Sequence, residues 1–207
     1  MSRFDASNVS ELAEAAKQEL RKRMRAVRAA HPAEALAQRS RSVVERVLAL
    51  PAFQAASGVA LFFPLTARKE VDLRELDRAA RELGKRVYYP FMEQRGEVTV
   101  SGLKVTAGLA DLAERGSHFL EPPKDLPDAE RGEVDLLLVP ALAVAPSGHR
   151  LGYGAGFYDS LLPDFRPPAQ AWTVAYDFQL LVELPTLPHD VACDGLVTDA
   201  RSLEASA

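Results

Sequence analysis

A glycine-rich segment at residues 150–159 carries the most distinctive chemistry in this chain. It reads RLGYGAGFYD, and residues 152–162 are expected to form a Gly-rich turn that enters a helix. Alternate glycines let backbone amides approach a ligand closely, and amides at a helix start attract anions. Arg150 adds a positive charge, and Asp159 adds a carboxylate that suits a cation. The segment therefore predicts a site for a phosphate and its magnesium.

The same segment has a simpler interpretation. Its glycine spacing matches neither a P-loop nor the usual dinucleotide fingerprint. A Gly-rich turn can also serve only to pack a helix against a sheet, and on spacing alone this alternative stays open.

A basic stripe near the start of the chain is the second candidate. Lys17, Arg21, Arg25 and Arg28 recur at intervals of four and three, so they share one face of an expected helix. Lys17 and Arg21 could reach phosphate oxygens. For Arg25 and Arg28 a solvated face is the better interpretation, and the net charge of −4 disfavours a helix that binds RNA phosphates.

Two acidic residues complete the candidate set. Glu70 ends the loop Leu65–Glu70 after the first expected strand, and such loops bind ligands in open α/β sheets. It could hold the polar edge of a heterocycle or only interact with the dipole of the helix beginning near Asp72. Asp194 could cap a turn or act as a second magnesium-facing carboxylate beside Asp159.

These residues need a scaffold, and apolar patterning supplies one. Short apolar runs alternate with amphipathic stretches, which indicates a mostly parallel sheet covered on both faces. We expect one domain over residues 1–207, with a frayed tail at 202–207. The expected helices are a first one reaching Arg28, then 32–50, 73–83 and 109–114, with a Gly-rich turn entering a further helix over 152–162. The expected strands are 58–63, 86–89, 98–105, 134–139, 171–176 and 195–198.

Composition excludes several classes of protein. The single cysteine, Cys193, allows no internal disulfide and suits a reducing compartment, where it would be a small core residue. The histidines are scattered, which disfavours a zinc site. No apolar run approaches ~18 residues, and the polar start argues against a secretory signal. We expect a cytoplasmic monomer without nucleic-acid or membrane partners.

Several ordered motifs resemble the 5-formyltetrahydrofolate cyclo-ligases, also called methenyltetrahydrofolate synthetases. The run VPALAVAPSGHRLGYGAGFYD is similar to the family signature, and Lys17–Arg21 is similar to its Lys-x-x-Leu-Arg motif. Further similar segments are 63–71, 120–122 and 189–199. The chain departs from the family pattern at Ala155, Phe157 and Ser160, where Gly or Lys, Tyr and Arg are common.

The resemblance implies a three-layer α/β/α fold like that of NagB, RpiA and CoA-transferases. It implies conversion of 5-formyltetrahydrofolate to 5,10-methenyltetrahydrofolate, using Mg²⁺ and ATP as co-substrate, through a phosphorylated formyl intermediate. Lys17 and Arg150 would be catalytic, Leu65 and Glu70 would bind the folate, and Asp159 and Asp194 would hold the metal. The implied ATP-binding residues are Lys17, Gln18, Glu19, Leu20, Arg21, Arg150, Leu151, Gly152, Tyr153, Gly154, Ala155, Gly156, Phe157 and Tyr158.

Two alternatives share the implied scaffold, because fold does not determine function. A phosphosugar isomerase or CoA-transferase-like enzyme would use the glycine loop without ATP, with Glu70 as its only candidate acid-base residue. A non-catalytic folate- or RNA-binding relative would be expected to lack Lys17 or Arg150, and both are present.

Overall fold

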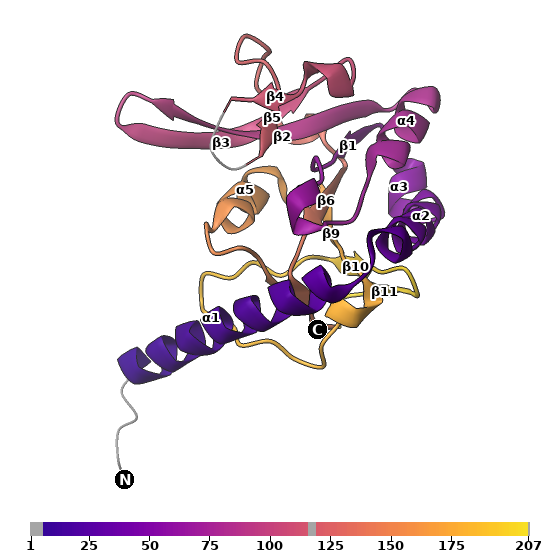
Figure 1. Ribbon diagram of the computed structural model, residues 1–207. Helices are drawn as coiled ribbons and strands as arrows, with labels where there is room; N and C mark the ends of the chain where they lie inside the picture. Colours follow the sequence, from indigo (N-terminus) through magenta and orange to yellow (C-terminus); the bar gives the residue numbers. More distant parts are fainter. Residues whose placement is uncertain (1–5, 116–118, 207) are drawn as a thin grey trace.

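A seven-stranded sheet runs through the centre of the computed structural model, which describes residues 6–115 and 119–206 (Figure 1). The strand order is β11-β10-β9-β6-β1-β2-β3. The five inner strands are parallel, and β3 and β11 are antiparallel edges. The strands are β1 (Gly58–Ala60), β2 (Arg86–Arg95), β3 (Val98–Val105), β6 (Leu136–Pro140), β9 (Gln170–Val174), β10 (Gly195–Val197) and β11 (Ser202–Glu204).

Helices cover both faces of the sheet. Helices α2, α3 and α4 pack on one face, and α5 covers the other (Figure 1). The helices are α1 (Ala6–Ala30), α2 (Ala33–Leu48), α3 (Pro51–Ala55), α4 (Arg74–Glu82) and α5 (Phe157–Phe165), with 3-10 turns η1 (Thr66–Arg68), η2 (Leu109–Asp111), η3 (Arg131–Glu133) and η4 (Asp177–Gln179). The predicted mixed α/β fold with a mostly parallel sheet is confirmed.

The central strands are apolar because both of their faces are buried. In β6, Leu136 and Leu138 join the core beneath α2–α4, whereas Leu137 and Val139 join the core beneath α5. All four side chains are at most 1% exposed. A separate hydrophobic core therefore packs on each face of the sheet.

The topology places a ligand site where the chain changes direction across the sheet. From β1 the chain crosses to β2 on one side, and it later returns to β6 on the other side of β1. Loops leaving the carboxyl ends of such neighbouring strands diverge and leave a crevice. The loop after β1 and the segment after β6 are those expected to carry function.

Helix α1 brings its charged face to that crevice. Its apolar residues Leu20 and Met24 pack against the hairpin formed by β7 (Ala143–Val144) and β8 (Arg150–Leu151). The N-terminal end of α1 extends away from the rest of the molecule (Figure 1). In the described parts of the chain, no helix is long and apolar enough to cross a membrane.

Three expectations about elements are wrong. Residues 109–114 are not one helix: after η2, β4 (Ala113–Glu114) pairs with β5 (Leu120–Glu121). The first strand is shorter than 58–63, because the chain turns away after Ala60 to form the crevice loop. Residues 202–204 are not frayed, because backbone pairing with β10 fixes them as β11; Ala207 lies outside the described residues.

Candidate active site

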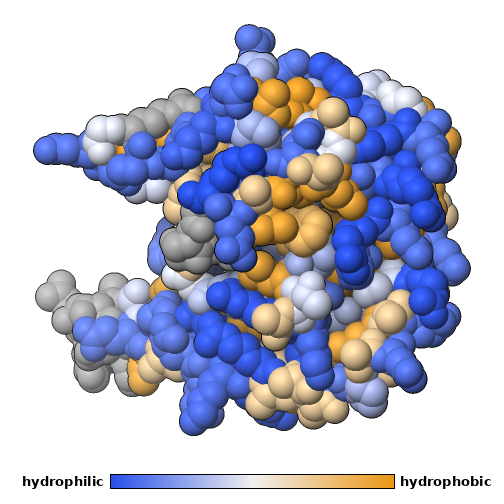
Figure 2. Space-filling view, turned by 45° about the horizontal axis from the view of Figure 1, so that its top comes forward, coloured by the Kyte–Doolittle hydropathy of each residue, from blue (hydrophilic) through white to orange (hydrophobic). Residues whose placement is uncertain are grey.

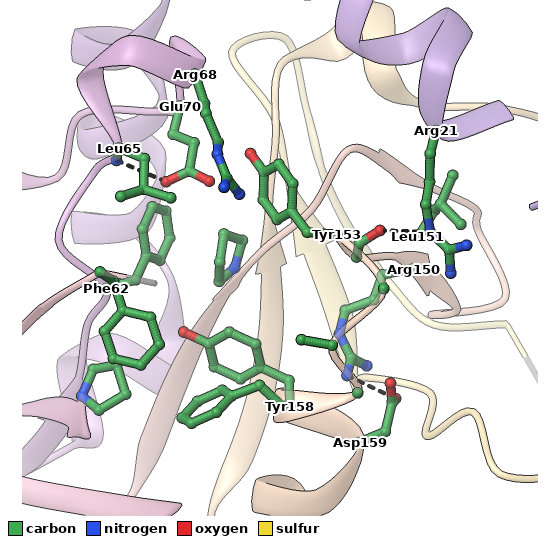
Figure 3. A pocket seen from close by; sticks show the side chains of 18 of the residues that line it. Arg21, Phe62, Leu65, Arg68, Glu70, Arg150, Leu151, Tyr153, Tyr158 and Asp159 are labelled. Atoms are coloured by element: carbon green, nitrogen blue, oxygen red, sulfur yellow. Dashed lines mark hydrogen bonds and ion pairs between the residues drawn. The ribbon is translucent and has the colours of Figure 1, made fainter. Parts of the chain in front are cut away.

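A cavity of about 230 Å³ opens where the loops after β1 and β6 meet α1 and the glycine-rich segment. Hydrophobic residues gather at the middle of the hollowed face, and hydrophilic residues surround them (Figure 2). The side chains separate into two walls (Figure 3). The lining residues outside the glycine-rich segment are Glu14, Lys17, Arg21, Phe62, Phe63, Leu65, Arg68, Glu70, Pro90, Met92, Phe119, Pro140, His189 and Asp190.

The glycine-rich segment forms one wall, and its backbone requires glycine at two positions. Gly154 has φ +106° and Gly156 has φ +67°, conformations that L side chains rarely adopt. Gly156 directly precedes α5, so the free amides of the first turn of α5 stand at the cavity. Every residue from Arg150 to Asp159 lines the cavity, which places the sequence-predicted segment there.

Lys17 joins this wall from α1. It is 4% exposed, and its Nζ lies 2.7 and 2.5 Å from the two carboxylate oxygens of Asp190. Asp190 also accepts a hydrogen bond from the Leu187 amide at 2.7 Å. Burial acts to raise the pKa of Asp190, but hydrogen bonding to Lys17 and Leu187 outweighs it and leaves this pKa below its usual value.

Two arginines complete the cationic wall. Arg21 donates from Nε to the Gly152 carbonyl at 3.2 Å and pairs with Glu14 at 3.0 Å. Arg150 Nη2 donates to Asp159 Oδ1 at 2.9 Å. Arg21 and Arg150 lie on the same side of the cavity (Figure 3), and Lys17 also lines it, so an anionic ligand would meet three positive charges.

Asp159 and Asp194 differ in their access to the cavity. Asp159 lines it, and its Oδ1 accepts from Arg150 and from the Val191 amide at 3.1 Å. In the described residues, Asp159 Oδ2 has no hydrogen-bond donor. Asp194 does not line the cavity, because Oδ1 accepts from Arg166 at 2.6 Å and Oδ2 from the Ala171 amide at 2.7 Å. The structure does not bring both carboxylates to the cavity.

The opposite wall is built around Glu70. Its Oε2 accepts the Leu65 amide at 2.8 Å, so carboxylate and loop fix each other (Figure 3). The residue is 8% exposed yet lines the cavity. Burial raises the pKa of Glu70, although the Tyr153 hydroxyl, the Leu65 amide and the positive charges of Arg28 and Arg68 oppose that shift.

Arg28 contradicts its expected place on a solvated face. It is 3% exposed and donates from Nη2 to the Tyr153 hydroxyl, with its guanidinium 5.6 Å from that ring. Arg25 is exposed as expected. Helical spacing placed both on one stripe, but along it Lys17, Arg21 and Arg28 are buried and only Arg25 is exposed.

Other sequence-predicted residues of α1 lie outside the cavity. Gln18 and Glu19 are exposed, and Gln18 donates to Glu14 at 3.0 Å. Leu20 packs against the β7–β8 hairpin. The Lys17–Arg21 motif therefore contributes only its first and last side chains to the cavity.

Sequence reasoning missed the apolar and loop residues of the site. Phe62 and Phe63 follow β1, whereas Pro90 and Met92 lie on β2. Their apolar character suits the flat face of an aromatic or heterocyclic ring. Asp190 was also missed, because it contacts Lys17 across 173 positions of the chain.

Comparisons with known proteins agree on one family. The model of the 5-formyltetrahydrofolate cyclo-ligase family matches residues 13–199. A 5-formyltetrahydrofolate cyclo-ligase of Mycolicibacterium smegmatis is 50% identical over 127 residues, covering 60% of this chain and 65% of that protein. A mitochondrial one of Arabidopsis thaliana is 27% identical, covering 78% of this chain and 66% of that protein. The chain thus spans just under two thirds of the length of these relatives.

A solved structure shares the architecture over most of both chains. The structure of Aquifex aeolicus 5,10-methenyltetrahydrofolate synthetase has a TM-score of 0.78 and 29% identity, covering 92% of this chain and 93% of that one.

Proposed function

Because the chain belongs to the 5-formyltetrahydrofolate cyclo-ligase family, we propose that it closes 5-formyltetrahydrofolate to 5,10-methenyltetrahydrofolate with consumption of ATP. One observation carries the proposal: a single cavity has a cationic, glycine-rich wall facing an apolar wall that contains a buried carboxylate. The first wall suits a triphosphate, and the second suits a folate ring. Two substrates that must exchange a phosphoryl group need such a shared space.

The reaction balances without a side-chain nucleophile. The formyl oxygen attacks the γ-phosphorus, and the bond between that phosphorus and the β,γ-bridging oxygen breaks to release ADP. The N10 lone pair then attacks the activated formyl carbon. The carbon–oxygen bond breaks, phosphate departs with the former formyl oxygen, and N10 loses its proton. The protein's tasks are positioning and charge neutralisation.

Lys17 and Arg150 are proposed to neutralise charge on the transferred phosphoryl group. Each is already paired with a carboxylate that also lines the cavity, Asp190 and Asp159 respectively. These pairs hold the cations in place before the nucleotide arrives, so little reorganisation is needed. The glycine-loop amides would bind the remaining phosphate oxygens.

The cavity offers Mg²⁺ one of the two candidate carboxylates, that of Asp159. Mg²⁺ in nucleotide sites uses one or two carboxylates together with phosphate oxygens and water. Asp159 offers Oδ2, which has no donor among the described residues, whereas both oxygens of Asp194 are engaged away from the cavity. We therefore propose Asp159 as the metal-facing residue. The ion, when bound, would draw electron density from the phosphoryl oxygens and neutralise their charge.

Glu70 and Leu65 are proposed to receive the folate. An ionised Glu70 can accept hydrogen bonds from the neighbouring N–H groups of the pterin ring, while the Phe62 and Phe63 side chains offer apolar contact. The phosphosugar-isomerase alternative has less support, because Glu70 would have to serve as its sole acid-base residue.

The decisive experiment follows the ultraviolet absorbance band of the methenyl product. The protein is mixed with 5-formyltetrahydrofolate, ATP and magnesium, and then with each omitted in turn. We expect product only with all three present. Folded protein that forms no product, or that forms product equally without ATP, would contradict the proposal.

A further inference from the structure

Arg28 is a buried charge without a carboxylate partner in the structure's described residues. It is 3% exposed, forms no ion pair there, and its Nε has no hydrogen-bond partner. A guanidinium stays protonated in proteins, so it cannot avoid the desolvation cost by losing its proton. Such a group requires a compensating interaction nearby.

The compensation runs through Tyr153. Arg28 Nη2 donates to the Tyr153 hydroxyl oxygen, and Tyr153 lines the cavity. Burial and the charge of Glu70 raise the pKa of Tyr153, so its hydroxyl keeps its single hydrogen at neutral pH. Because Arg28 occupies the oxygen as a donor, that hydrogen must go to a different acceptor.

Glu70 is the acceptor toward which the hydroxyl turns. The Tyr153 hydroxyl faces the end of η1 where Glu70 and Arg68 lie (Figure 3). The two side chains also act on each other's pKa: the Tyr153 hydroxyl lowers the pKa of Glu70, and the charge of Glu70 raises that of Tyr153. Three elements distant in sequence, α1, the η1 loop and the glycine-rich segment, thus converge on one carboxylate.

We propose that Arg28 is a positioning residue for the folate-binding carboxylate: it orients the Tyr153 hydroxyl toward Glu70 and, with it, keeps Glu70 an anionic acceptor. The proposal rests on the proposed function, since it assigns Glu70 to the N–H groups of the folate ring. It also links the two walls, because Tyr153 belongs to the glycine-rich segment. Arg28 itself does not line the cavity.

The direction of the pH effect follows from the groups around Glu70. Glu70 titrates against Arg28 from α1, Arg68 from η1, and Tyr153 and Tyr158 from the glycine-rich segment and α5. Burial raises the pKa of Glu70, whereas Arg28 and the Tyr153 hydroxyl lower it. Removing either of these two groups should therefore raise the pKa of Glu70 further. Glu70 would then be protonated up to a higher pH, and folate binding would be lost there.

The test is equilibrium binding of 5-formyltetrahydrofolate, without ATP, measured by calorimetry across pH. In Arg28→Met and Tyr153→Phe we expect the acidic limb of affinity to move to higher pH. On that limb each pH unit of displacement corresponds to about tenfold weaker binding. Affinity should approach the wild-type value at alkaline pH. Arg28→Lys retains the cation, so its limb should move less than that of Arg28→Met.

The controls separate this inference from its premise. Arg23→Met removes an exposed arginine from the same helix and should leave the limb in place. If Arg28→Met fails to fold, Tyr153→Phe keeps the ring and gives the same readout. The proposal for Arg28 would be overturned if folate affinity fell equally at every pH, or if the acidic limb of the affinity profile stayed at its wild-type pH. Wild-type protein that binds no folate at any pH would instead overturn the proposed function.

Discussion

Two buried carboxylates, Glu70 and Asp77, have similar neighbours, but we expect one to bind a ligand and the other to stabilise the fold. Each lies near an arginine and a tyrosine hydroxyl, and they are 8% and 3% exposed. Asp77 accepts two hydrogen bonds from Arg81 and one from Tyr89, all at 2.9 Å, and it does not line the candidate active-site cavity. Glu70 has no ion pair within the described residues, and it faces the cavity. A saturated buried charge stabilises the scaffold, whereas an unsaturated one at a cavity is available to a ligand.

Asp77→Asn should produce the largest effect, and on stability alone. Breaking a buried ion pair by removing one charge costs about 3 to 5 kcal/mol, because Arg81 is left uncompensated. Urea unfolding followed by circular dichroism measures this loss. Glu75→Gln, an exposed carboxylate on the same helix, should change stability little. If the Asp77 variant kept wild-type stability, the more complete hydrogen bonding of Asp77 could not be what distinguishes it from Glu70.

Glu70→Gln should have the converse effect. Losing a charged acceptor costs about 2 to 4 kcal/mol, or roughly 30-fold to 1000-fold in kcat/KM for the folate. Steady-state kinetics with varied folate measures it, while the KM for ATP should change little. A variant with weakened ATP use and intact folate use would mean that the two walls are assigned the wrong way round.

The same variant should not lose stability at neutral pH. Because burial raises the pKa of Glu70 in the folded state, this group's contribution to stability falls as pH rises from its unfolded value through the raised one. At pH 7 ionised Glu70 therefore destabilises the fold, and glutamine removes that penalty. Its unfolding free energy should equal or exceed that of the wild type.

Lys17→Met tests a charge that is ion-paired, as Asp77 is, and that lines the cavity, as Glu70 does. Its partner Asp190 also lines the cavity. We expect kcat/KM for ATP to fall about 100-fold, the order seen when one donor to a developing charge is lost. Lys22→Met, on an exposed position of α1, is the matched control. Normal ATP use by the Lys17 variant would remove Lys17 from the site.

Tyr89→Phe should give the smallest effect. It deletes one of the three hydrogen bonds to Asp77 while Arg81 remains, so the expected loss of stability is about 1 kcal/mol. Thermal unfolding measures it, and kinetic constants should not change. A loss as large as that of Asp77→Asn would indicate that Tyr89 and Arg81 act as one unit.

The parts of the site that local spacing controls could be predicted from the sequence. The glycine-rich turn into α5 and the helical interval between Lys17 and Arg21 are local features, and both lie at the cavity. Glu70 was recognised as a candidate because loops after β-strands bind ligands, although its burial was not visible. The mixed α/β fold likewise followed from apolar runs.

The rest depends on contacts between distant residues. Asp190 faces Lys17 across 173 positions, and Arg28 meets Tyr153 across 125. No local pattern distinguishes Arg28 from the exposed Arg25 three positions earlier, because only tertiary packing decides which is buried. The strand at 202–204 was missed for a similar reason: its order comes from pairing with β10.

The most direct test of the central claim, that one cavity joins a triphosphate to a folate, uses 5-formyltetrahydrofolate labelled with ¹⁸O in the formyl group. Inorganic phosphate released with ATP and magnesium is analysed by mass spectrometry. We predict one ¹⁸O in the phosphate for each methenyl product formed, because the formyl oxygen becomes a phosphate oxygen. Methenyl product accompanied by unlabelled phosphate would contradict it.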